Sequence, residues 1–565
     1  MTKRENCPAT AAAWNVGAHG HAPLREGIGN HATISFSLSP LGERVASVVS
    51  SVRKSKIKGR PSPPLGERVS RAAGRVRGSG LLLLLLPLVA VLPACLLGPN
   101  YNRPKVNAPP AFRGAEGAAQ QASFADLPWW EVFKDPTLQG LIKTSLANNY
   151  DLLIAVQRIE QARQVAAQAR AQFFPTLNYQ GAIGGTKNPL GVIAGGGEVK
   201  SKSEGAVLIA LSAAWEADVW GKIRRSNEAA KAQYLATEEG KRAVMLSLVS
   251  DVAQAYFQLL GLDLQLEIAR QTTANFGDSL KLFTQRLEGG VASKLQTSRA
   301  EAAQATAAAT IPELERQIAL TENQINVLLG QNPAPITHTA KLLEETLPPE
   351  IPAGLPSVLL ERRPDVLEAE QEVRAANAQI GIAQANFFPQ IGLTAFLGRG
   401  SSPLSAFTSP NATIWNALAT AAGPIYEGGA LKAKKRQAIA AWEQTALQYQ
   451  QTALNAFQDV SNALISREKY EGTRVEQARA VQAYQEAVNV AFQRYNAGKA
   501  SYYEVLEAQQ LLFPAQSNLA QTQLNQRLVI VQLYKVLGGG WNLQDPQWMG
   551  PQAPAAPTTP TAPNP

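Results

Sequence analysis

The chain has 565 residues, of which 45% are hydrophobic and 7% aromatic, so ordinary burial is possible without an aromatic-rich core. The formal charge of +9 belongs to the first 94 residues, where 13 Lys and Arg stand against 4 Asp and Glu, and 13 − 4 = 9. From Cys95 onward, 53 − 13 = 40 basic residues equal 44 − 4 = 40 acidic ones. This balance gives no electrostatic basis for nucleic-acid binding.

Metal and thiol chemistry are limited by the few histidines and cysteines. After residue 94 only Cys95 and His338 remain, so neither a His/Cys metal cluster nor a disulfide can form within that region. A phosphate-binding Gly-Lys loop and a nucleophile elbow are also absent from this sequence. We expect no metal, no cofactor and no enzyme activity, and we interpret His338 as a surface loop residue.

The N-terminal region carries a secretion signal. Residues 81–94 are an apolar run that follows several arginines, too short and too Pro-interrupted to span a membrane. Leu92-Pro93-Ala94-Cys95 resembles the lipobox of bacterial lipoproteins, in which the cysteine becomes the acylated first residue, although Pro93 replaces the usual small residue. We predict lipidation at Cys95. The alternative is an ordinary signal peptide with an incidental cysteine.

Residues 1–80 lack helical or strand periodicity. SPLGERV at 39–45 recurs as SPPLGERV at 62–69 in a Ser/Arg/Gly-rich stretch, which is typical of translated upstream DNA. We expect synthesis to begin near Val69 or Val76, which would leave a leader of ordinary length before Cys95.

The remainder is internally duplicated. Residues 151–184 align without a gap on 365–398, and RLEGGVAS at 286–293 aligns on RYNAGKAS at 494–501. The two alignments predict two copies of one design. The expected divisions are an N-terminal segment at 95–135, a first repeat at 136–340 with hairpins at about 175–216 (β) and 222–330 (coiled coil), a second repeat at 341–545 with hairpins at about 389–425 and 428–538, and a disordered Pro-rich tail at 546–565.

Each repeat changes from helix to strand at a Phe-Phe-Pro sequence. Pro175 and Pro389 lack a donor and disfavour helix in the residue before them, so extended chain is expected to follow. Residues 205–216 place apolar side chains on alternate positions, and 391–397 is short and apolar. Such strands, next to aromatic residues and joined by a long polar loop, are typical of a membrane β-barrel. A soluble hairpin is the alternative.

Very long helices are predicted from Ile223 to about Leu287 and from about Leu431 to Tyr495, because no proline interrupts them. At ~1.5 Å per residue each reaches on the order of 100 Å. A coiled-coil seam runs along the first, formed by Leu248, Val252, Ala255, Leu259, Leu262 and Leu266. Four strands per chain are too few to close a barrel, so we expect oligomers, although the residues alone do not choose between two, three and four copies.

The duplicated units, DVWGKIRR at 218–225, PIYEGGALKA at 424–433 and the two Gly-containing turns together resemble the TolC-like outer-membrane factor family. That family comprises outer-membrane efflux lipoproteins of tripartite, resistance-nodulation-division type systems. The resemblance implies a mainly α fold with a membrane β-barrel portion. It also implies a trimer with a twelve-stranded barrel, four strands per chain, that continues into a twelve-helix periplasmic α-barrel.

The resemblance also implies a function and partners. The chain would be a lipid-anchored exit duct in the cell outer membrane, extending into the periplasm and passively conducting drugs or other small toxic compounds. Its partners would be a periplasmic membrane-fusion adaptor, an inner-membrane pump and outer-membrane lipids, with no nucleic acid. One alternative is the duct of a type I protein or peptide secretion system. Another is a periplasmic coiled-coil lipoprotein without a channel.

Functional residues carried over from the family lie at the two ends of the long helices. We expect the turns to contact the adaptor and the second turn to hold a periplasmic gate, whose two glutamates replace Gln296 and Arg299 of the first half. Simpler interpretations are also open. In these, the turn residues serve only to form the turns, the two glutamates are only solvated, and Tyr495 only packs in the core. At the opposite end, three aromatic residues mark the membrane boundary or pack inside the junction. The sets are the turn residues Arg286, Gly290, Ser293, Arg494, Gly498 and Ser501; the gate residues Tyr495, Glu504 and Glu507; and the aromatic residues Trp215, Trp220 and Tyr426.

Overall fold

A computed structural model of the chain describes residues 95–115, 123–187, 203–344, 352–401 and 404–540. The chain divides into two units, Met1–Leu82 and Leu83–Pro565, and every described residue belongs to the second. The expected upstream extension, signal peptide and Pro-rich tail therefore lie outside the described residues.

Matching elements in the two halves have equal lengths. The short helices have 22 residues each, the first strands 12, the long helices 67 and the returning helices 35. Their bounds are α4 Tyr150–Ala171 and α8 Pro364–Ala385, β1 Thr176–Lys187 and β3 Gln390–Ser401, α5 Lys222–Glu288 and α9 Ala430–Asn496, and α6 Lys294–Leu328 and α10 Tyr502–Val536. The other elements are β2 Ser203–Ala217, β4 Thr413–Ala422, α2 Trp129–Val132, α3 Pro136–Asn148, α7 Pro356–Arg362 and three 3-10 helices, η1 Phe124–Asp126, η2 Leu404–Ala406 and η3 Pro410–Ala412.

Both Phe-Phe-Pro sequences convert helix to strand as predicted. After α4 and α8 end, the N–H of the second phenylalanine bonds to the carbonyl three residues before it, at 3.0 Å for both Phe174 and Phe388. The strand then begins at the residue after each proline. The proline thus separates the last turn from the extended chain.

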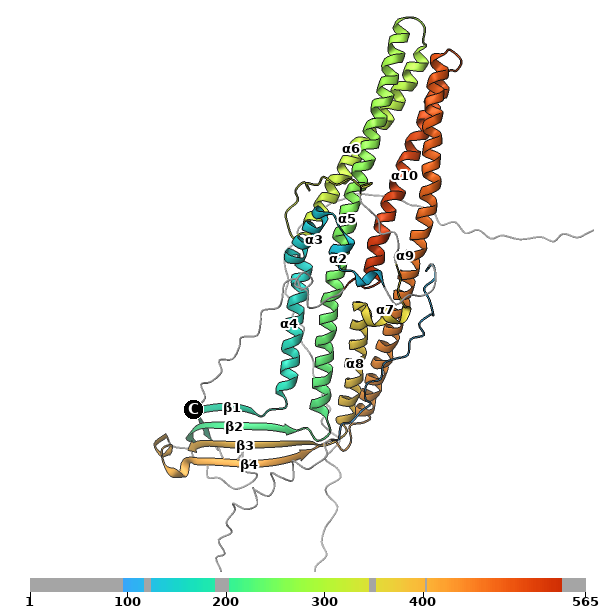
Figure 1. Ribbon diagram of the computed structural model, residues 1–565. Helices are drawn as coiled ribbons and strands as arrows, with labels where there is room; N and C mark the ends of the chain where they lie inside the picture. Colours follow the sequence, from blue (N-terminus) through green and yellow to red (C-terminus); the bar gives the residue numbers. More distant parts are fainter. Residues whose placement is uncertain (1–94, 116–122, 188–202, 345–351, 402–403, 541–565) are drawn as a thin grey trace, which may run out of the picture. The chain divides into compact units, whose positions relative to one another are not determined.

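The four strands form one antiparallel sheet in the order β1-β2-β3-β4 (Figure 1). Residues directly opposite one another share a face of the sheet. One row of such partners is apolar and more than half exposed, namely Tyr179 (87%), Leu211 (63%), Leu397 (59%) and Trp415 (73%). The neighbouring row on the opposite face is mostly polar, namely Asn178, Ser212, Phe396 and Asn416. The two faces therefore differ in polarity.

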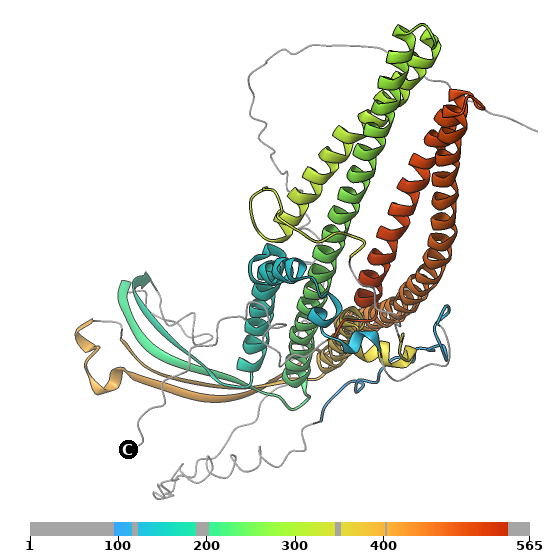
Figure 2. The same cartoon turned by 45° about the horizontal axis from the view of Figure 1, so that its top comes forward.

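The helices form two long antiparallel hairpins, α5–α6 and α9–α10, which lie side by side in both views (Figures 1 and 2). Helix α5 is central, because it packs against α4, α6, α8 and α10. All six residues of the predicted seam are buried. By length and composition α5 contains a stretch apolar enough to cross a membrane, but 67% of that stretch is buried inside the protein, as in a core helix.

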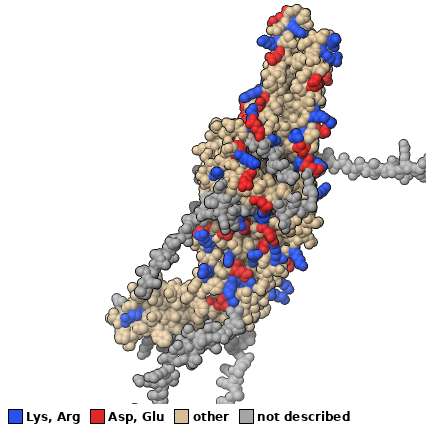
Figure 3. Space-filling view, in the orientation of Figure 1, with Lys and Arg blue, Asp and Glu red and all other residues tan. Residues whose placement is uncertain are grey.

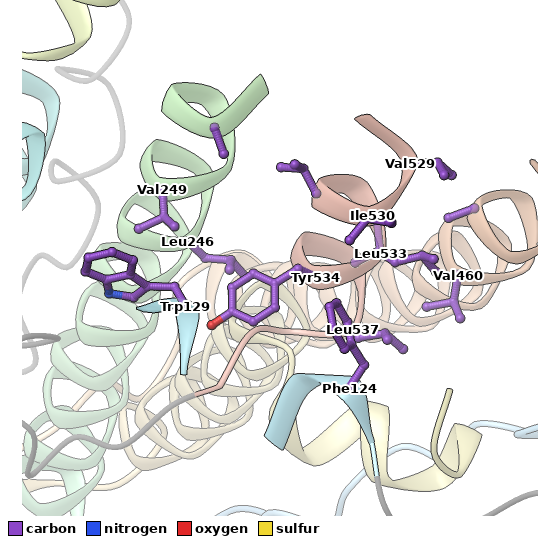
Figure 4. Close-up of a cluster of buried hydrophobic side chains, with 14 of the residues drawn as sticks. Phe124, Trp129, Leu246, Val249, Val460, Val529, Ile530, Leu533, Tyr534 and Leu537 are labelled. Atoms are coloured by element: carbon purple, nitrogen blue, oxygen red, sulfur yellow. The ribbon is translucent and has the colours of Figure 1, made fainter. Parts of the chain in front are cut away.

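The largest core lies where α2, α5 and α10 meet (Figure 4). Trp129 and Tyr534 are fully buried there, and the rings of Phe133 and Tyr534 meet edge to face with centroids 5.9 Å apart. A separate core lies near the hairpin tips around Phe283 and Val505. The hairpins are therefore packed together both in the region of Trp129 and Tyr534 and near their tips.

Candidate functional site

The first hairpin tip is closed by hydrogen bonds of the chain itself. The carbonyl of Arg286 accepts from the N–H groups of Val291 at 2.9 Å and Ala292 at 3.1 Å. Gly290 adopts a left-handed φ of 72°, which glycine allows at little cost. Ser293 begins α6 with a capping box in which Gln296 Oε1 accepts the Ser293 N–H at 2.9 Å.

The second tip has the same path but a different cap. Gly498 has a φ of 69°, and the Lys499 N–H bonds to the Arg494 carbonyl at 2.9 Å. Ser501 directly precedes α10 but makes no side-chain cap hydrogen bond. Glu504, which takes the place of Gln296, instead approaches Arg494, with Oε2 3.7 Å from Nη2.

The two tips are joined to each other through Arg286 and Tyr495. The Arg286 guanidinium donates to the Tyr495 hydroxyl, and its Cζ lies 4.7 Å from the centre of the Tyr495 ring. The rings of Phe283 and Tyr502 pack beside this contact in a tilted arrangement with centroids 3.7 Å apart. Burial raises the pKa of Tyr502 to about 12. A predicted adaptor residue and a predicted gate residue therefore contact each other within one chain.

The two gate glutamates lie on the same side of α10 but in different surroundings. Glu504 is half-exposed next to Arg494, and Glu507 is exposed. Their first-half equivalents serve other contacts, since Gln296 completes a capping box and Arg299 lies over the Tyr503 ring at 5.7 Å. At these two pairs of equivalent positions, carboxylates are present in the second half and absent from the first.

The predicted boundary tryptophans contact the Phe-Phe-Pro segments. Trp215 Nε1 donates to the Phe173 carbonyl at 2.9 Å, and Trp220 Nε1 donates to the Pro389 carbonyl at 2.7 Å. Trp220 also stacks on Phe388 with centroids 4.7 Å apart. These contacts are packing within the junction, whereas the third aromatic residue, Tyr426, is 88% exposed.

The segment after Cys95 is fastened beside the start of α5 by an arginine that the sequence analysis did not single out. Arg225, only 1% exposed, donates to the carbonyls of Leu97 at 3.1 Å and Gly98 at 3.2 Å, and pairs with Glu228 at 2.7 Å. The exposed Cys95 is thereby held at the strand-to-helix junction. The sequence offered one indication of this role, because Arg225 is the last residue of the DVWGKIRR motif.

His338 lies in the loop segment after α6, as expected, and its side chain is partly buried by specific contacts. Its Nε2 lies 2.6 Å from Asp263 of α5, and its Nδ1 lies 2.9 Å from the Ile336 carbonyl. The ring also meets Tyr256 edge to face at 6.3 Å. The histidine therefore fastens the segment after α6 to the central helix. Among the described residues, no group of three or more His, Cys, Asp or Glu side chains is placed to hold a metal ion.

Charge is distributed unevenly between the strands and the helices. On the side drawn in Figure 3, few charged side chains lie over the strands, while acidic and basic groups mix along the helices. This distribution matches a sheet in contact with lipid and helices in contact with water.

Known proteins resemble this chain over most of its length. The probable efflux pump outer membrane protein TtgC of Pseudomonas putida is 35% identical over 473 residues, which are 82% of this chain and 97% of TtgC. The probable outer membrane lipoprotein SilC of Salmonella typhimurium is 33% identical over 472 residues, 82% of this chain and 99% of SilC. The cation efflux system protein CusC of Escherichia coli is 32% identical over 468 residues, 81% of this chain and 98% of CusC.

Solved structures match as well. A crystal structure of CusC has a TM-score of 0.71 at 30% identity, and the outer-membrane channel OprN has 0.73 at 30%; each match covers 79% of this chain and 100% of the other. The fold is therefore TolC-like. The family described as outer membrane efflux protein matches residues 141–331 and 355–539, which include most of both repeats. This chain belongs to the outer membrane efflux protein family.

Proposed function

We propose that three copies of this chain close an outer-membrane channel that serves as the passive exit duct of a tripartite efflux pump. The four-stranded sheet is the observation that carries the proposal. Within the described chain, β1 and β4 pair on one side only. Lipid cannot satisfy such edges, so further copies must continue the sheet. Three copies supply twelve strands, and their paired helices continue the wall into the periplasm.

The two faces of the sheet fit this arrangement. The exposed apolar row that contains Leu211 and Trp415 would contact lipid, and the more polar row that contains Asn178 and Ser212 would line a water-filled lumen. A soluble sheet would gain nothing from an exposed row of this kind.

Lipid attached to Cys95 would add a second membrane contact. The buried Arg225 holds the following residues against the start of α5, one element beyond the strands. An acyl chain on the exposed Cys95 would therefore start at the edge of the membrane portion and could reach the bilayer.

The hairpin tips would contact an adaptor and hold the duct closed. The Arg286–Tyr495 contact joins the two hairpins of one chain, so the hairpins can separate at the tip only when this contact breaks. Glu504 and Glu507 from three copies would form a ring of six carboxylates, which repel one another and attract cations. Three copies would present six similar turns, and an adaptor ring of six members could bind one turn with each member.

The energy and the choice of substrate would come from the partners, an adaptor and an inner-membrane pump. Relatives of comparable identity are named for different cargo, since one is a toluene efflux protein and another a cation efflux protein. We therefore propose that this chain conducts small toxic compounds without recognising them closely and without catalysing a reaction.

Two neighbouring substitutions on β2 test the channel. Leu211→Arg places a charge on the face assigned to lipid, at a cost of about 2–4 kcal/mol near the membrane centre. Ser212→Arg places the same charge on the face assigned to water. We expect the unaltered protein to form trimers in detergent and to conduct ions in planar bilayers. The Ser212→Arg variant should do the same but with altered ion selectivity. The Leu211→Arg variant should no longer form trimers. A monomeric, non-conducting protein would refute the proposal.

A further inference from the structure

Three basic side chains share one face at the start of α9. Lys432, Lys435 and Arg436 are spaced by three and four residues, which places them next to one another on a helix. They lie in the first two turns of α9, and the short segment between the end of β4 and this helix contains Ile425, fully exposed, and Tyr426, 88% exposed. We call these three cations the basic triad.

No ion pair of the basic triad is found among the described residues, and the one carboxylate in the segment between β4 and α9, Glu427, is exposed and makes no ion pair there. The ion pairs that α9 makes there begin at Asp459 and continue to Arg494, several turns farther along the helix. Like charges three and four residues apart repel each other, and cations near a helix N-terminus oppose the helix dipole. An anion from outside the described chain would relieve both penalties.

The matching junction of the first repeat is neutralised internally. At the start of α5, Arg224 pairs with Asp218 at 3.0 Å, and Arg225 pairs with Glu228 at 2.7 Å. Each arginine also donates to backbone carbonyls, Arg224 to Cys95 at 3.3 Å and Arg225 to Leu97 at 3.1 Å. This junction therefore needs no external anion.

The second repeat lacks both of these acids. Residues 222–288 and 430–496 match one to one at an offset of 208. Within the matched helices Glu228 corresponds to Arg436 of the basic triad, and the same offset, extended four residues before the helices, places the exposed Tyr426 at the position of Asp218. One duplicated position has thus exchanged a carboxylate for an aromatic ring and another has exchanged it for a cation. The change removes internal neutralisation and adds an amphipathic side chain.

We infer that the basic triad binds the phosphate group of an anionic phospholipid, such as phosphatidylglycerol or cardiolipin, in the leaflet of the outer membrane that faces the periplasm. This inference rests on the proposed placement of the strands in the membrane. A phosphate is the anion that a bilayer offers where a strand ends, and guanidinium and ammonium groups are its usual partners. Tyr426 and Ile425 would insert beside the headgroup.

Lipid titration of the full-length protein in detergent, followed by native mass spectrometry, tests the site. The probes are phosphatidylglycerol and the zwitterionic phosphatidylcholine. We expect tighter binding of phosphatidylglycerol, lowered about tenfold by Lys435→Gln with Arg436→Gln. Lys434→Gln is the matched control, because it removes the same charge one residue away on the opposite side of the helix. It should change the affinity less than about twofold.

Three results would overturn the inference. They are unchanged phosphatidylglycerol binding by the double variant, equal loss with Lys434→Gln, and displacement of the lipid by millimolar inorganic phosphate, which would indicate a site for free phosphate. Bilayer recording on the same samples separates this inference from the channel proposal. If conductance persists while lipid binding does not depend on the basic triad, only the lipid site fails. A change of ion selectivity with unchanged lipid binding would assign the basic triad to the lumen.

Discussion

Helices α5 and α9 are the two copies of one long helix, yet their surroundings differ. Each has 67 residues and begins after a glycine in the left-handed conformation. Buried side chains run along most of α5, from Ile223 to Phe283, whereas those of α9 are confined to two stretches, Tyr449 to Leu464 and Val488 to Ala491. Duplication has therefore produced one helix, α5, that forms an internal frame of the chain, and one helix, α9, that is not buried along most of its length in the single chain.

The frame should fail when its buried arginine is removed. Arg225→Ala leaves the Leu97 and Gly98 carbonyls without their donor and Glu228, which is partly exposed, without its partner, which should cost about 1–3 kcal/mol. We expect a large fall in the melting temperature of the detergent-solubilised protein and poor assembly. Lys434→Ala on α9 is the control and should change the melting temperature little. Similar losses in both variants would remove the distinction between the helices.

The contact between the two tips should control opening. Arg286→Ala and Tyr495→Phe each break the hydrogen bond, and a bond to a charged group that is partly exposed is worth about 1 kcal/mol, or roughly fivefold in the open population. Single-channel recording should show longer or wider openings. Tyr503→Phe, next along the chain from the buried Tyr502, keeps its ring near Arg299 and should leave gating unchanged. Unchanged gating in the Tyr495→Phe variant would show that the contact between Arg286 and Tyr495 does not control opening.

The acids of the second tip should affect ions more than stability. Glu504→Gln with Glu507→Gln removes six carboxylates from the proposed trimer, so cation selectivity and block by divalent cations should fall severalfold. Gln296→Glu in the first tip is the converse test and should add some cation attraction. Equal conductance and equal block in all three proteins would show that the ring does not form.

The smallest effect is expected at the packed surface between α5 and α8. Burial, together with Glu372, Asp365 and Glu239, raises the pKa of Glu368 to about 6. A carboxyl with a raised folded-state pKa binds more protons when folded, so its ionisation lowers stability as the pH rises from about 4.5 to 6 and beyond. Glu368→Gln should therefore raise the melting temperature slightly at pH 7.5 and less at pH 5. An equal change at both pH values would contradict this.

Local patterns in the sequence predicted the elements, and long-range contacts explain what they did not predict. Both long helices were placed within one residue at each end, because no proline or cap interrupts their pattern. Strand β3 is longer than the predicted 391–397, because glycines extend it where no apolar pattern is visible. A Cβ at Gly398 would lie 2.5 Å from the Ala210 side chain, so only glycine allows β2 this close.

The site was predicted in part, for the same reason. The turn glycines follow from local geometry and were expected, whereas Leu97, which accepts from Arg225, and Asp263, which contacts His338, each lie more than 70 residues away in the sequence. The difference between the two caps depends on one residue, because Glu504 faces Arg494, whereas Gln296 at the equivalent position completes a capping box. Which residues gate the channel depends on copies that a single chain does not contain.

The equal lengths of the paired helices constrain how this protein can change. Each residue turns an α-helix by about 100° and advances it by ~1.5 Å. A one-residue insertion in α5 alone would rotate its tip and move it farther from the strands than the tip of α9, and it would separate Arg286 from Tyr495. Insertions in the long helices are therefore expected to be tolerated only when the two hairpins lengthen together.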